Sequence, residues 1–276
     1  MLGRSRHGRG QQGKGYMSTF DAAVGAASVA ALRAAGCVFA EDEAALLATA
    51  AGTEAELADM VRRRAGGLPL EHVLGWAEFC GLRVAVDPGV FVPRRRTELL
   101  AREGAALAGH GAVVVDLACG SGAIGLAVAA LAGDVELHAT DIDPAAVACA
   151  ERNLAASGGR VYQGDLYDPL PASVRGLVGV VTANVPYVPS SAVPLLPPEA
   201  RLHEPLAALD GGPDGLDLVR KAAAGAPGWL AAGGHLLVET SDRQSAAAVD
   251  AFAAAGLAAW TVGDADSGTA VIIGRR

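Results

Sequence analysis

The sequence lacks several features that would assign it to a specialised class. Its four cysteines are scattered without the paired spacing of metal sites, which is typical of reduced thiols in a cytoplasmic protein. No apolar run approaches the roughly 20 residues that span a bilayer, and no apolar segment follows the charges at the N-terminus. We therefore expect a globular cytoplasmic protein without a metal ion, an export signal or a membrane segment.

Acidic residues are missing from the first 16 positions and abundant afterwards. The net charge is −8, and residues 1–16 contain four basic residues and no acidic one, which leaves −12 for the remainder. A protein with this much negative charge is a poor general binder of nucleic acid, and we expect no direct binding of nucleic acid. We also expect the protein to be a monomer. The basic, glycine-rich residues 1–17 are expected to form a disordered tail, and both Met1 and Met17 are possible starts of translation.

Clustered histidines, cysteines and paired carboxylates are also absent from residues 18–75, where the pattern predicts a bundle of short helices. These helices are expected over 19–35, 41–51 and 53–66, each ending at a glycine. Thr53 with Glu56 three residues later predicts a capping box, and Pro69 suits the start of a short helical turn. A docking or lid module for the substrate is the expected role.

From Trp76 onward the pattern changes to β-type runs and then to regular β/α alternation. Residues 76–93 are predicted to link the two domains through a hairpin of strands 76–79 and 82–86. Alternation over residues 94–276 predicts a mostly parallel sheet with helices on both faces and an antiparallel edge hairpin that turns at 266–268. The strands are expected at 112–117, 135–140, 160–163, 177–182, 235–240, 258–262 and 269–273.

A glycine-rich stretch lies where the first strand of this alternation meets its helix: Asp116-Leu117-Ala118-Cys119-Gly120-Ser121-Gly122. Glycines let the backbone approach a ligand, and the start of the helix offers free N–H groups. The residues from Gly120 to Gly125 also fit the G-x-G-x-x-G pattern, and Asp141 stands 21 residues after Gly120, as in dinucleotide sites. Spacing alone therefore leaves a nicotinamide cofactor open.

Two carboxylates favour S-adenosylmethionine as the cofactor. Asp116, among the glycines, would repel a pyrophosphate but attract the ammonium group of that cofactor, directly or through water. Asp141 ends the next strand and could bind both ribose hydroxyls, while Asp143 is expected only to cap the following helix. Cys119 is expected to fill a small space in the core. The predicted cofactor-binding residues are Asp116, Ala118, Cys119, Gly120, Ser121, Gly122, Asp141, Asp165, Leu166 and Asn184.

Asn184-Val185-Pro186-Tyr187 follows a short apolar run and suits the recognition of a planar amino or amide group. The side-chain oxygen of Asn184 and the carbonyl of Val185 can both accept hydrogen bonds from one NH2 group. Pro186 keeps the residue before it extended, and the ring of Tyr187 can pack on the flat face of the group. Asn-x-Pro is also a common turn signal, so this string alone does not establish a site.

In order and spacing these motifs resemble the HemK/PrmC-type protein-(glutamine-N5) methyltransferases, which modify the glutamine of the Gly-Gly-Gln motif in peptide-chain release factors. The resemblance extends from about residue 41 to the end of the chain. Besides the two stretches above, it rests on Glu71 to Gly75, Glu78 to Leu82, Phe91-Val92-Pro93-Arg94 with Thr97-Glu98, Thr140 to Pro144, Gly164-Asp165-Leu166, Glu204-Pro205-Leu206 and Gly211 to Leu216.

The resemblance implies a class I S-adenosylmethionine-dependent methyltransferase fold, a Rossmann-like α/β domain with a mostly parallel seven-stranded sheet after a small helical domain. The first and fourth strands of that sheet would be neighbours, so that the glycine loop and Asn184 flank one crevice. It also implies that Asn184 and the carbonyl of residue 185 bind the glutamine amide of a protein partner, with Tyr187 and Phe91 shaping the pocket. The implied activity is methyl transfer from S-adenosylmethionine to that amide.

The sequence departs from the family pattern at two positions. Val185 stands where members that act on release factors have the first proline of Asn-Pro-Pro-Tyr, and Arg95 stands where proline is usual. The carbonyl of residue 185 is kept, but a branched side chain replaces a flat ring. A methyltransferase of the same fold that acts on another protein or small-molecule amino or amide group is therefore an alternative. A DNA adenine methyltransferase and a non-catalytic cofactor-binding protein are further alternatives.

Amide methylation requires no strong general base, and the sequence offers no obvious one. His203 and Glu204 follow the motif in a proline-rich loop and are expected on a lid or at the surface. Arg95 and Arg96, in a run of three arginines, are expected on a solvated face.

Overall fold

The computed structural model describes residues 21–264 and 268–276, and the chain divides into two compact units after Gly66. The predicted tail over residues 1–17, the predicted helix start at Thr19 and the turn residues 266–267 lie outside the described residues. Within the described part, no helix is long and apolar enough to cross a membrane. The same part contains no group of three or more His, Cys, Asp or Glu side chains that could hold a metal ion.

The described residues of the first unit form three helices, α1 (Ala22–Ala34), α2 (Ala40–Ala50) and α3 (Glu54–Ala65). Their apolar faces are buried at Leu32, Leu47 and Leu57, which are at most 1% exposed. Glu43 of α2 and Arg64 of α3 form a largely buried ion pair, in which the Arg64 Nε lies 2.6 Å from the carboxylate. Arg33 of α1 also pairs with Glu41 of α2, so the helices of this unit are joined by apolar packing and by charged contacts.

The start of α3 shows the predicted capping box in a shifted form. The Thr53 hydroxyl oxygen accepts a hydrogen bond from the Glu56 N–H at 3.2 Å, as expected. The Glu56 carboxylate accepts from the Gly52 N–H at 2.7 Å, whereas a regular capping box would use the N–H of Thr53. Both interactions satisfy donors at the helix start, and Gly66 caps its end.

The second unit begins with the helix α4 (Leu70–Leu74) and the antiparallel hairpin of β1 (Trp76–Phe79) and β2 (Leu82–Ala85). Gly75 ends α4 with a positive φ of 78°, and its carbonyl accepts from the Val86 N–H. Val86, Val90 and Val92 form an apolar cluster with Cys149 of a later helix. Because the hairpin packs there, the compact units divide at Gly66, earlier than the domain boundary that we expected after residue 75.

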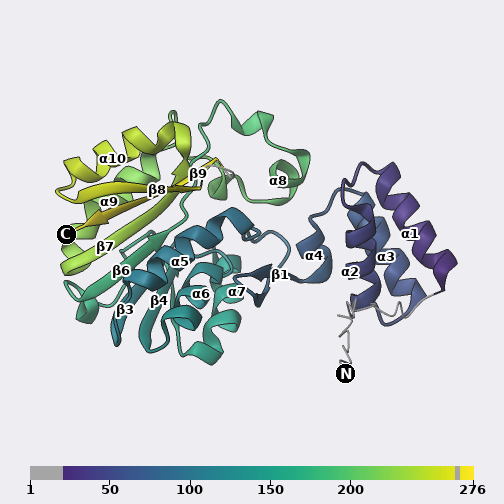
Figure 1. Ribbon diagram of the computed structural model, residues 1–276, viewed down its shortest axis with the longest axis horizontal. Coiled ribbons are helices and arrows are strands. Elements are labelled where there is room, and N and C mark those ends of the chain that lie inside the picture. Colours follow the sequence, from purple (N-terminus) through teal and green to yellow (C-terminus); the bar gives the residue numbers. More distant parts are fainter. Residues whose placement is uncertain (1–20, 265–267) are drawn as a thin grey trace, which may run out of the picture. The chain divides into compact units, whose positions relative to one another are not determined.

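Within the described residues, seven strands form one sheet in the order β5-β4-β3-β6-β7-β9-β8 (Figure 1). The strands β5, β4, β3, β6 and β7 are parallel to one another, and β9 is antiparallel to both of its neighbours, β7 and β8. The predicted mostly parallel sheet with an antiparallel edge hairpin is therefore confirmed. The strands are β3 (Ala112–Leu117), β4 (Val135–Asp141), β5 (Arg160–Gln163), β6 (Val178–Ala183), β7 (Leu230–Ser241), β8 (Ala258–Asp264) and β9 (Thr269–Arg275).

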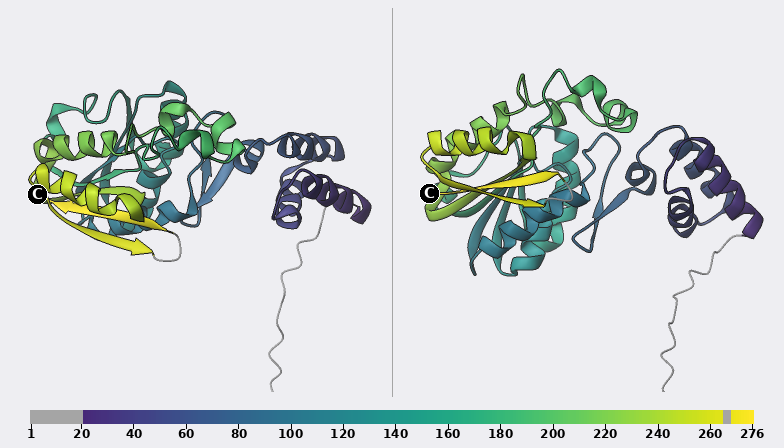
Figure 2. Two further views of the ribbon diagram at one scale, coloured as in Figure 1. Left: turned by 90° about the horizontal axis from the view of Figure 1, so that it is seen from above. Right: turned by 45° about the horizontal axis from the view of Figure 1, so that its top comes forward.

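Helices cover both faces of this sheet (Figure 2). Successive residues of a strand point to opposite faces. Val114 and Val180 accordingly pack in the apolar cluster shared with α5, α6 and α7, whereas Val115 and Val181 pack in the cluster shared with α9 and α10. The helices of this unit are α5 (Glu98–Leu107), α6 (Ala123–Ala132), α7 (Pro144–Leu154), α8 (Pro198–His203), α9 (Asp217–Trp229) and α10 (Ser245–Ala254).

The cap of α3 provides a test of local stability. We expect Thr53→Ala to destabilise the start of α3 by about 1 kcal/mol, because the Glu56 N–H loses its acceptor. Hydrogen exchange of the α3 amides measures this effect. Thr49→Ala is the matched control, since the exposed Thr49 hydroxyl only bonds back to the Ala45 carbonyl within α2. Equal effects of the two changes would contradict the capping assignment.

Candidate active site

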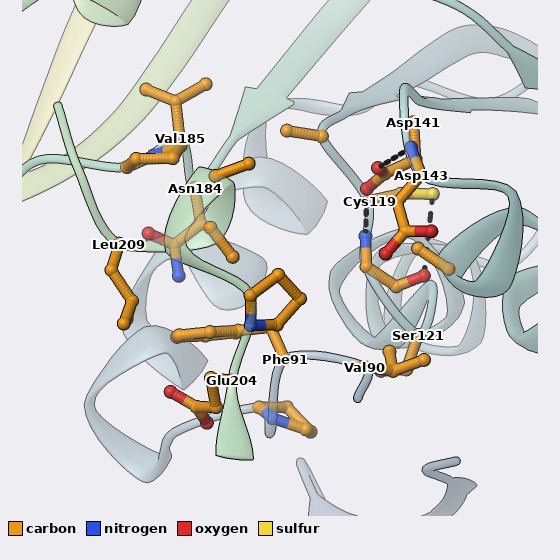
Figure 3. Close-up of a pocket in the computed structure, with 18 of the residues that line it drawn as sticks. Val90, Phe91, Cys119, Ser121, Asp141, Asp143, Asn184, Val185, Glu204 and Leu209 are labelled. Atoms are coloured by element: carbon orange, nitrogen blue, oxygen red, sulfur yellow. Dashed lines mark hydrogen bonds between the residues drawn. The ribbon is translucent and has the colours of Figure 1, made fainter. Parts of the chain in front are cut away.

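A cavity of about 830 Å³ lies at the carboxyl ends of β3, β4 and β6. Parallel pairing places these strand ends on one edge of the sheet. Figure 3 shows Asn184 on one side of this cavity and Asp141 with Cys119 on the other. Most of the predicted site residues line it: Phe91, Ala118, Cys119, Gly120, Ser121, Asp141, Asp165, Leu166, Asn184, Val185, Pro186 and Tyr187.

The glycine loop is held in position by the end of the neighbouring strand. The Cys119 N–H donates to the Thr140 carbonyl at 3.0 Å, and the Gly120 N–H donates to the Asp141 carboxylate at 2.8 Å. Gly120 has a positive φ of 55°, and a Cβ added there would meet no atom within 4 Å. The backbone at Gly120 therefore borders open space that a ligand could fill.

Gly122 has a packing role, and its expected contact with the cofactor stays a prediction. It does not line the cavity. A Cβ added at this position, where φ is +77°, would approach Ala150 and Leu154 of α7 to 3.3 Å. Glycine is therefore needed here for close packing between the start of α6 and α7.

Asp141 and Asp143 differ in their contacts, and the binding of ribose hydroxyls by Asp141 stays a prediction. The Asp141 carboxylate accepts from the N–H groups of Gly120 and Asp143, and it lines the cavity. Burial raises the pKa of Asp141, and these two N–H groups partly oppose that effect. Asp143 accepts from the Ala145 N–H at 2.9 Å, so the predicted helix cap is confirmed.

Asp116 lies beneath the loop and does not line the cavity. It is fully buried, and its two carboxylate oxygens accept from the Gly125 N–H at 2.9 Å and from the Thr182 hydroxyl at 3.0 Å. Burial raises the pKa of Asp116 to about 7, although the two hydrogen bonds act to lower it. Asp116 therefore has a structural role, since it joins β3 to α6 and β6. Of the two modes of cofactor attraction that we expected, the one through water stays a prediction.

The end of β5 completes this side of the cavity. The Gly164 N–H donates to the Asp141 carbonyl, and Leu166 has a positive φ of 47°. Asp165 forms an ion pair with Lys221 of α9. Cys119 is 6% exposed, and burial raises the pKa of its thiol, which agrees with the prediction of a space-filling side chain.

Asn184 is oriented by a residue to which we had assigned no role. Its Nδ2 lies 3.4 Å from the hydroxyl oxygen of Thr97, which is 1% exposed. Because the NH2 group of Asn184 points to Thr97, the side-chain oxygen remains to accept from a ligand. The Thr97-Glu98 pair in the matching motif was the sequence signal for this role.

Tyr187 is anchored by its hydroxyl group. The hydroxyl donates to Glu239 of β7 at 3.0 Å, and burial together with the Glu239 charge raises the pKa of Tyr187. Arg96 donates to the same carboxylate oxygen at 3.4 Å. Arg96 is exposed, in agreement with the predicted solvated face, and its guanidinium group also reaches this buried carboxylate. Arg95 is exposed, as predicted.

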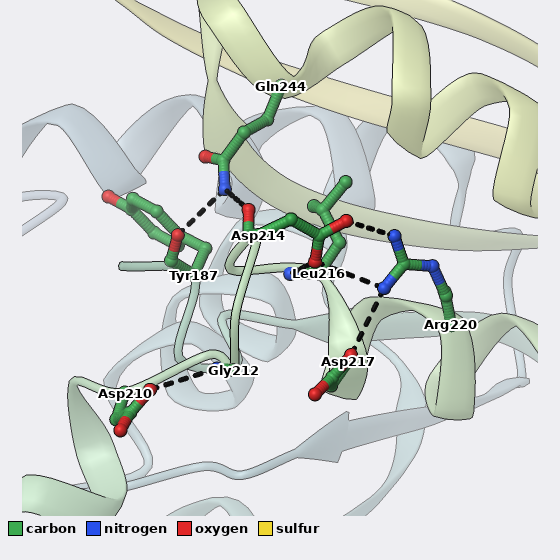
Figure 4. A network of polar contacts seen from close by, with 8 residues as sticks. All are labelled: Tyr187, Asp210, Gly212, Asp214, Leu216, Asp217, Arg220 and Gln244. Atoms are coloured by element: carbon green, nitrogen blue, oxygen red, sulfur yellow. Dashed lines mark hydrogen bonds and ion pairs between the residues drawn. The ribbon is translucent and has the colours of Figure 1, made fainter. Parts of the chain in front are cut away.

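A glycine-rich turn packs directly on the backbone of the acceptor motif. A Cβ added to Gly211 would come within 2.6 Å of the Pro186 carbonyl oxygen, and one added to Gly215 would collide with that of Tyr187. Gln244 joins the same parts: its NH2 group donates to the Tyr187 carbonyl at 2.8 Å and to the Asp214 carbonyl at 3.0 Å (Figure 4). Only glycine permits this contact, which explains the residue type at these positions.

Glu204 corrects the expectation of a lid or surface side chain. Its side chain is 0% exposed, and one carboxylate oxygen accepts from Arg94 at 2.5 Å and from the Val92 N–H at 3.3 Å. Burial raises the pKa of Glu204, and the Arg94 charge opposes this. Arg94 also lies over the ring of Phe91, 5.1 Å from its centroid. This pair fixes the loop after β6 to the segment that carries Phe91.

Val185 contributes its side chain to the core. It is 1% exposed and packs in the apolar cluster on the α9 and α10 face of the sheet. Its substitution for proline therefore changes the buried packing beside the cavity and keeps a backbone carbonyl at this position. The arrangement offers hydrogen-bond acceptors and aromatic rings to a flat polar group, with a glycine loop on the opposite wall.

Comparison with known proteins decides the family. Residues 81–189 match the family model described as Methyltransferase small domain. The release factor glutamine methyltransferase of Geobacter sulfurreducens is 37% identical over 219 residues, which cover 79% of this chain and 76% of that protein. This chain belongs to the release factor glutamine methyltransferase family. The relative from Mycolicibacterium smegmatis is 40% identical over 195 residues, 70% of this chain and 69% of its own length.

Solved structures support the same fold. A methyltransferase from Pyrococcus furiosus has a TM-score of 0.54 at 16% identity and covers 71% of this chain and 89% of its own. At this identity the likeness concerns the fold alone. The family assignment rests on the sequence relatives.

Asp116 leads to a prediction about pH and stability. Its pKa of about 7 in the folded protein exceeds the usual 3.8, so the folded state holds the proton more tightly and loses relative stability as the pH rises between these values. Asp116→Asn keeps one acceptor and removes the charge. We expect the free energy of unfolding of the wild type to fall relative to the variant by up to about 1.4 kcal/mol per pH unit in this window. Denaturant titrations at several pH values measure the difference, and a constant difference would contradict the assignment.

The glycine contact at Tyr187 leads to a second prediction. We expect Gly215→Ala to reduce methyl transfer strongly and to leave cofactor affinity almost unchanged, because the added methyl group displaces the acceptor motif and not the glycine loop. Kinetic assays and calorimetry measure the two quantities. Gly256→Ala is the matched control, since Gly256 has nearly the same positive φ, +81°, but its added Cβ would meet nothing within 4 Å. If both variants lost methyl-transfer activity equally, backbone strain alone would explain the effect, and the contact with Tyr187 would not be needed.

Proposed function

We propose that this protein transfers a methyl group from S-adenosylmethionine to the side-chain amide nitrogen of a glutamine in a protein, the Gly-Gly-Gln motif of a peptide-chain release factor. The observation that carries the proposal is the single cavity lined by the glycine loop on one side and by Asn184 to Tyr187 on the other. The names of the sequence relatives support the identity of the acceptor.

The residues of the glycine side fit S-adenosylmethionine. Gly120 borders open space where a Cβ would stand, and the Asp141 carboxylate at the end of β4 can accept from ribose hydroxyls. Leu166 adds an apolar surface suited to the adenine. When bound, the cofactor supplies a methyl group on a positively charged sulfur. Asp116 would act on it only through the loop or an intervening water.

The acceptor side can hold and orient a glutamine amide. The Asn184 side-chain oxygen and the Val185 carbonyl would accept from the two hydrogens of its NH2 group, while Phe91 and Tyr187 pack beside its plane. The lone pair of an amide nitrogen is delocalised, so the nitrogen is a weak nucleophile. The two acceptors would stabilise the positive charge that develops on it as the methyl group arrives. The proton then leaves an already acidified nitrogen, so the site needs no strong base.

Val185 motivates a second candidate, an enzyme of the same fold that methylates another amino or amide group. The Val185 side chain packs in the core, so this position still offers a backbone carbonyl to the acceptor, as the first candidate requires. We further propose that the enzyme works in the cytoplasm as a monomer. Helices α1 to α3 would dock the partner protein.

Asn184→Ala tests the assignment. We expect this change to reduce transfer to the glutamine of a release-factor Gly-Gly-Gln domain by at least about 100-fold, because the reacting amide loses its main acceptor. Cofactor affinity should change little, since Asn184 acts on the acceptor side. Mass spectrometry of the acceptor domain and calorimetry with the cofactor measure the two effects.

The outcomes separate the competing functions. Absence of methylated glutamine with the wild-type enzyme would refute the proposed acceptor, whereas methylation of a different amino group would support the second candidate. Parallel loss of cofactor binding and transfer in the Asn184 variant would place this residue in the cofactor site.

A further inference from the structure

Glu239, near the carboxyl end of β7, is a buried carboxylate that the proposed reaction does not use. It is 0% exposed and does not line the cavity. Its Oε1 accepts from the Tyr187 hydroxyl and from Arg96, while its Oε2 is buried without a hydrogen-bond partner among the described residues. Such a group lowers stability unless its charge is well compensated, so a role beyond packing is expected of it.

Both partners of Glu239 border the acceptor motif. Tyr187 is the aromatic residue of the motif itself. Arg96 belongs to the short turn Arg95–Thr97, and Thr97 is the residue that accepts from the Asn184 amide. The carboxylate therefore reaches Tyr187 through one hydrogen bond and Asn184 through the turn.

The geometry points to Glu239 as a positioning residue for the acceptor. Its charge holds the Tyr187 ring and the turn from Arg95 to Thr97 in place, so that Asn184 meets the glutamine amide in one orientation. This inference rests on the proposed function, because it assumes an acceptor that binds at Asn184. It adds a residue from β7, about 50 positions after the motif, to the determinants of acceptor geometry.

A positioning role predicts effects on acceptor turnover that a purely structural role would not produce. Glu239→Gln keeps an oxygen for the Tyr187 hydroxyl and removes the charge that attracts Arg96. We expect kcat for the Gly-Gly-Gln domain to fall by about 10- to 100-fold, the range for losing a charged hydrogen-bond partner, with cofactor affinity unchanged. Tyr187→Phe should also lower kcat, because it removes the hydroxyl that Glu239 holds.

The double variant tests whether the two residues act together. If Glu239 works through Tyr187 and the adjoining turn, Glu239→Gln combined with Tyr187→Phe should be about as slow as the slower single variant. A combined effect equal to the product of the single effects would overturn the inference. So would a parallel loss of cofactor affinity and kcat, which is the signature of general destabilisation.

A measurement without an acceptor keeps this inference separate from the proposed function. The chain contains four tyrosines, so labelling their ring carbons gives few NMR signals, and the signal missing in Tyr187→Phe identifies Tyr187. We expect Glu239→Gln to shift that signal. Glu136→Gln is the control, because Glu136 is an ion-paired strand carboxylate that does not line the cavity.

Two results then have distinct meanings. An unshifted Tyr187 signal in a folded Glu239→Gln protein would overturn the positioning role, whatever the acceptor. A shifted signal together with wild-type enzyme that does not methylate the Gly-Gly-Gln domain would support the contact and refute the proposed acceptor.

Discussion

The parallel pairing of β3 with β4 and β6 is the constraint on which the site depends. Its register sets Leu117 of β3 beside Thr140 of β4 and Ala183 of β6. The next residues of each strand therefore leave the sheet at the same edge, and one cavity receives the glycine loop and the motif that begins at Asn184. The hydrogen bond from Thr182 to Asp116 joins two of these strands below the cavity floor.

The acceptor motif is held mainly by parts of the chain that follow or precede it by many residues. The turn of residues 211–215 packs on its carbonyl groups, and Gln244 bonds to Tyr187 from the segment after β7. Thr97 bonds to Asn184 from the segment before α5. A flat nitrogen acceptor can be oriented by so few polar groups only if these groups are themselves fixed.

Two residues in the run of three arginines form ion pairs with carboxylates that are buried in the interior. Arg94 is partly buried and Arg96 is exposed like Arg95, yet Arg94 and Arg96 each reach a buried carboxylate, Glu204 and Glu239 respectively. Each carboxylate belongs to a different segment, so the two ion pairs tie the loop after β6 and the end of β7 to the same short stretch. Buried charges of this kind tolerate little displacement, because an unpaired carboxylate in the core is costly.

The sequence by itself determined the periodic elements, the parallel sheet and the two loops that meet at the cavity, because apolar periodicity, glycines and strand ends are local signals. It also located Asp141 and the Asn184 motif at the carboxyl ends of neighbouring strands, where the structure has its cavity. Only the tertiary structure decided that Asp116 and Gly122 support the loop from below, that Glu204 is buried, and that Thr97 and Glu239 reach the motif. These roles depend on charges and hydrogen-bond partners that are far apart in the sequence and meet only in the fold. The spacing of residues along the chain does not predict such contacts.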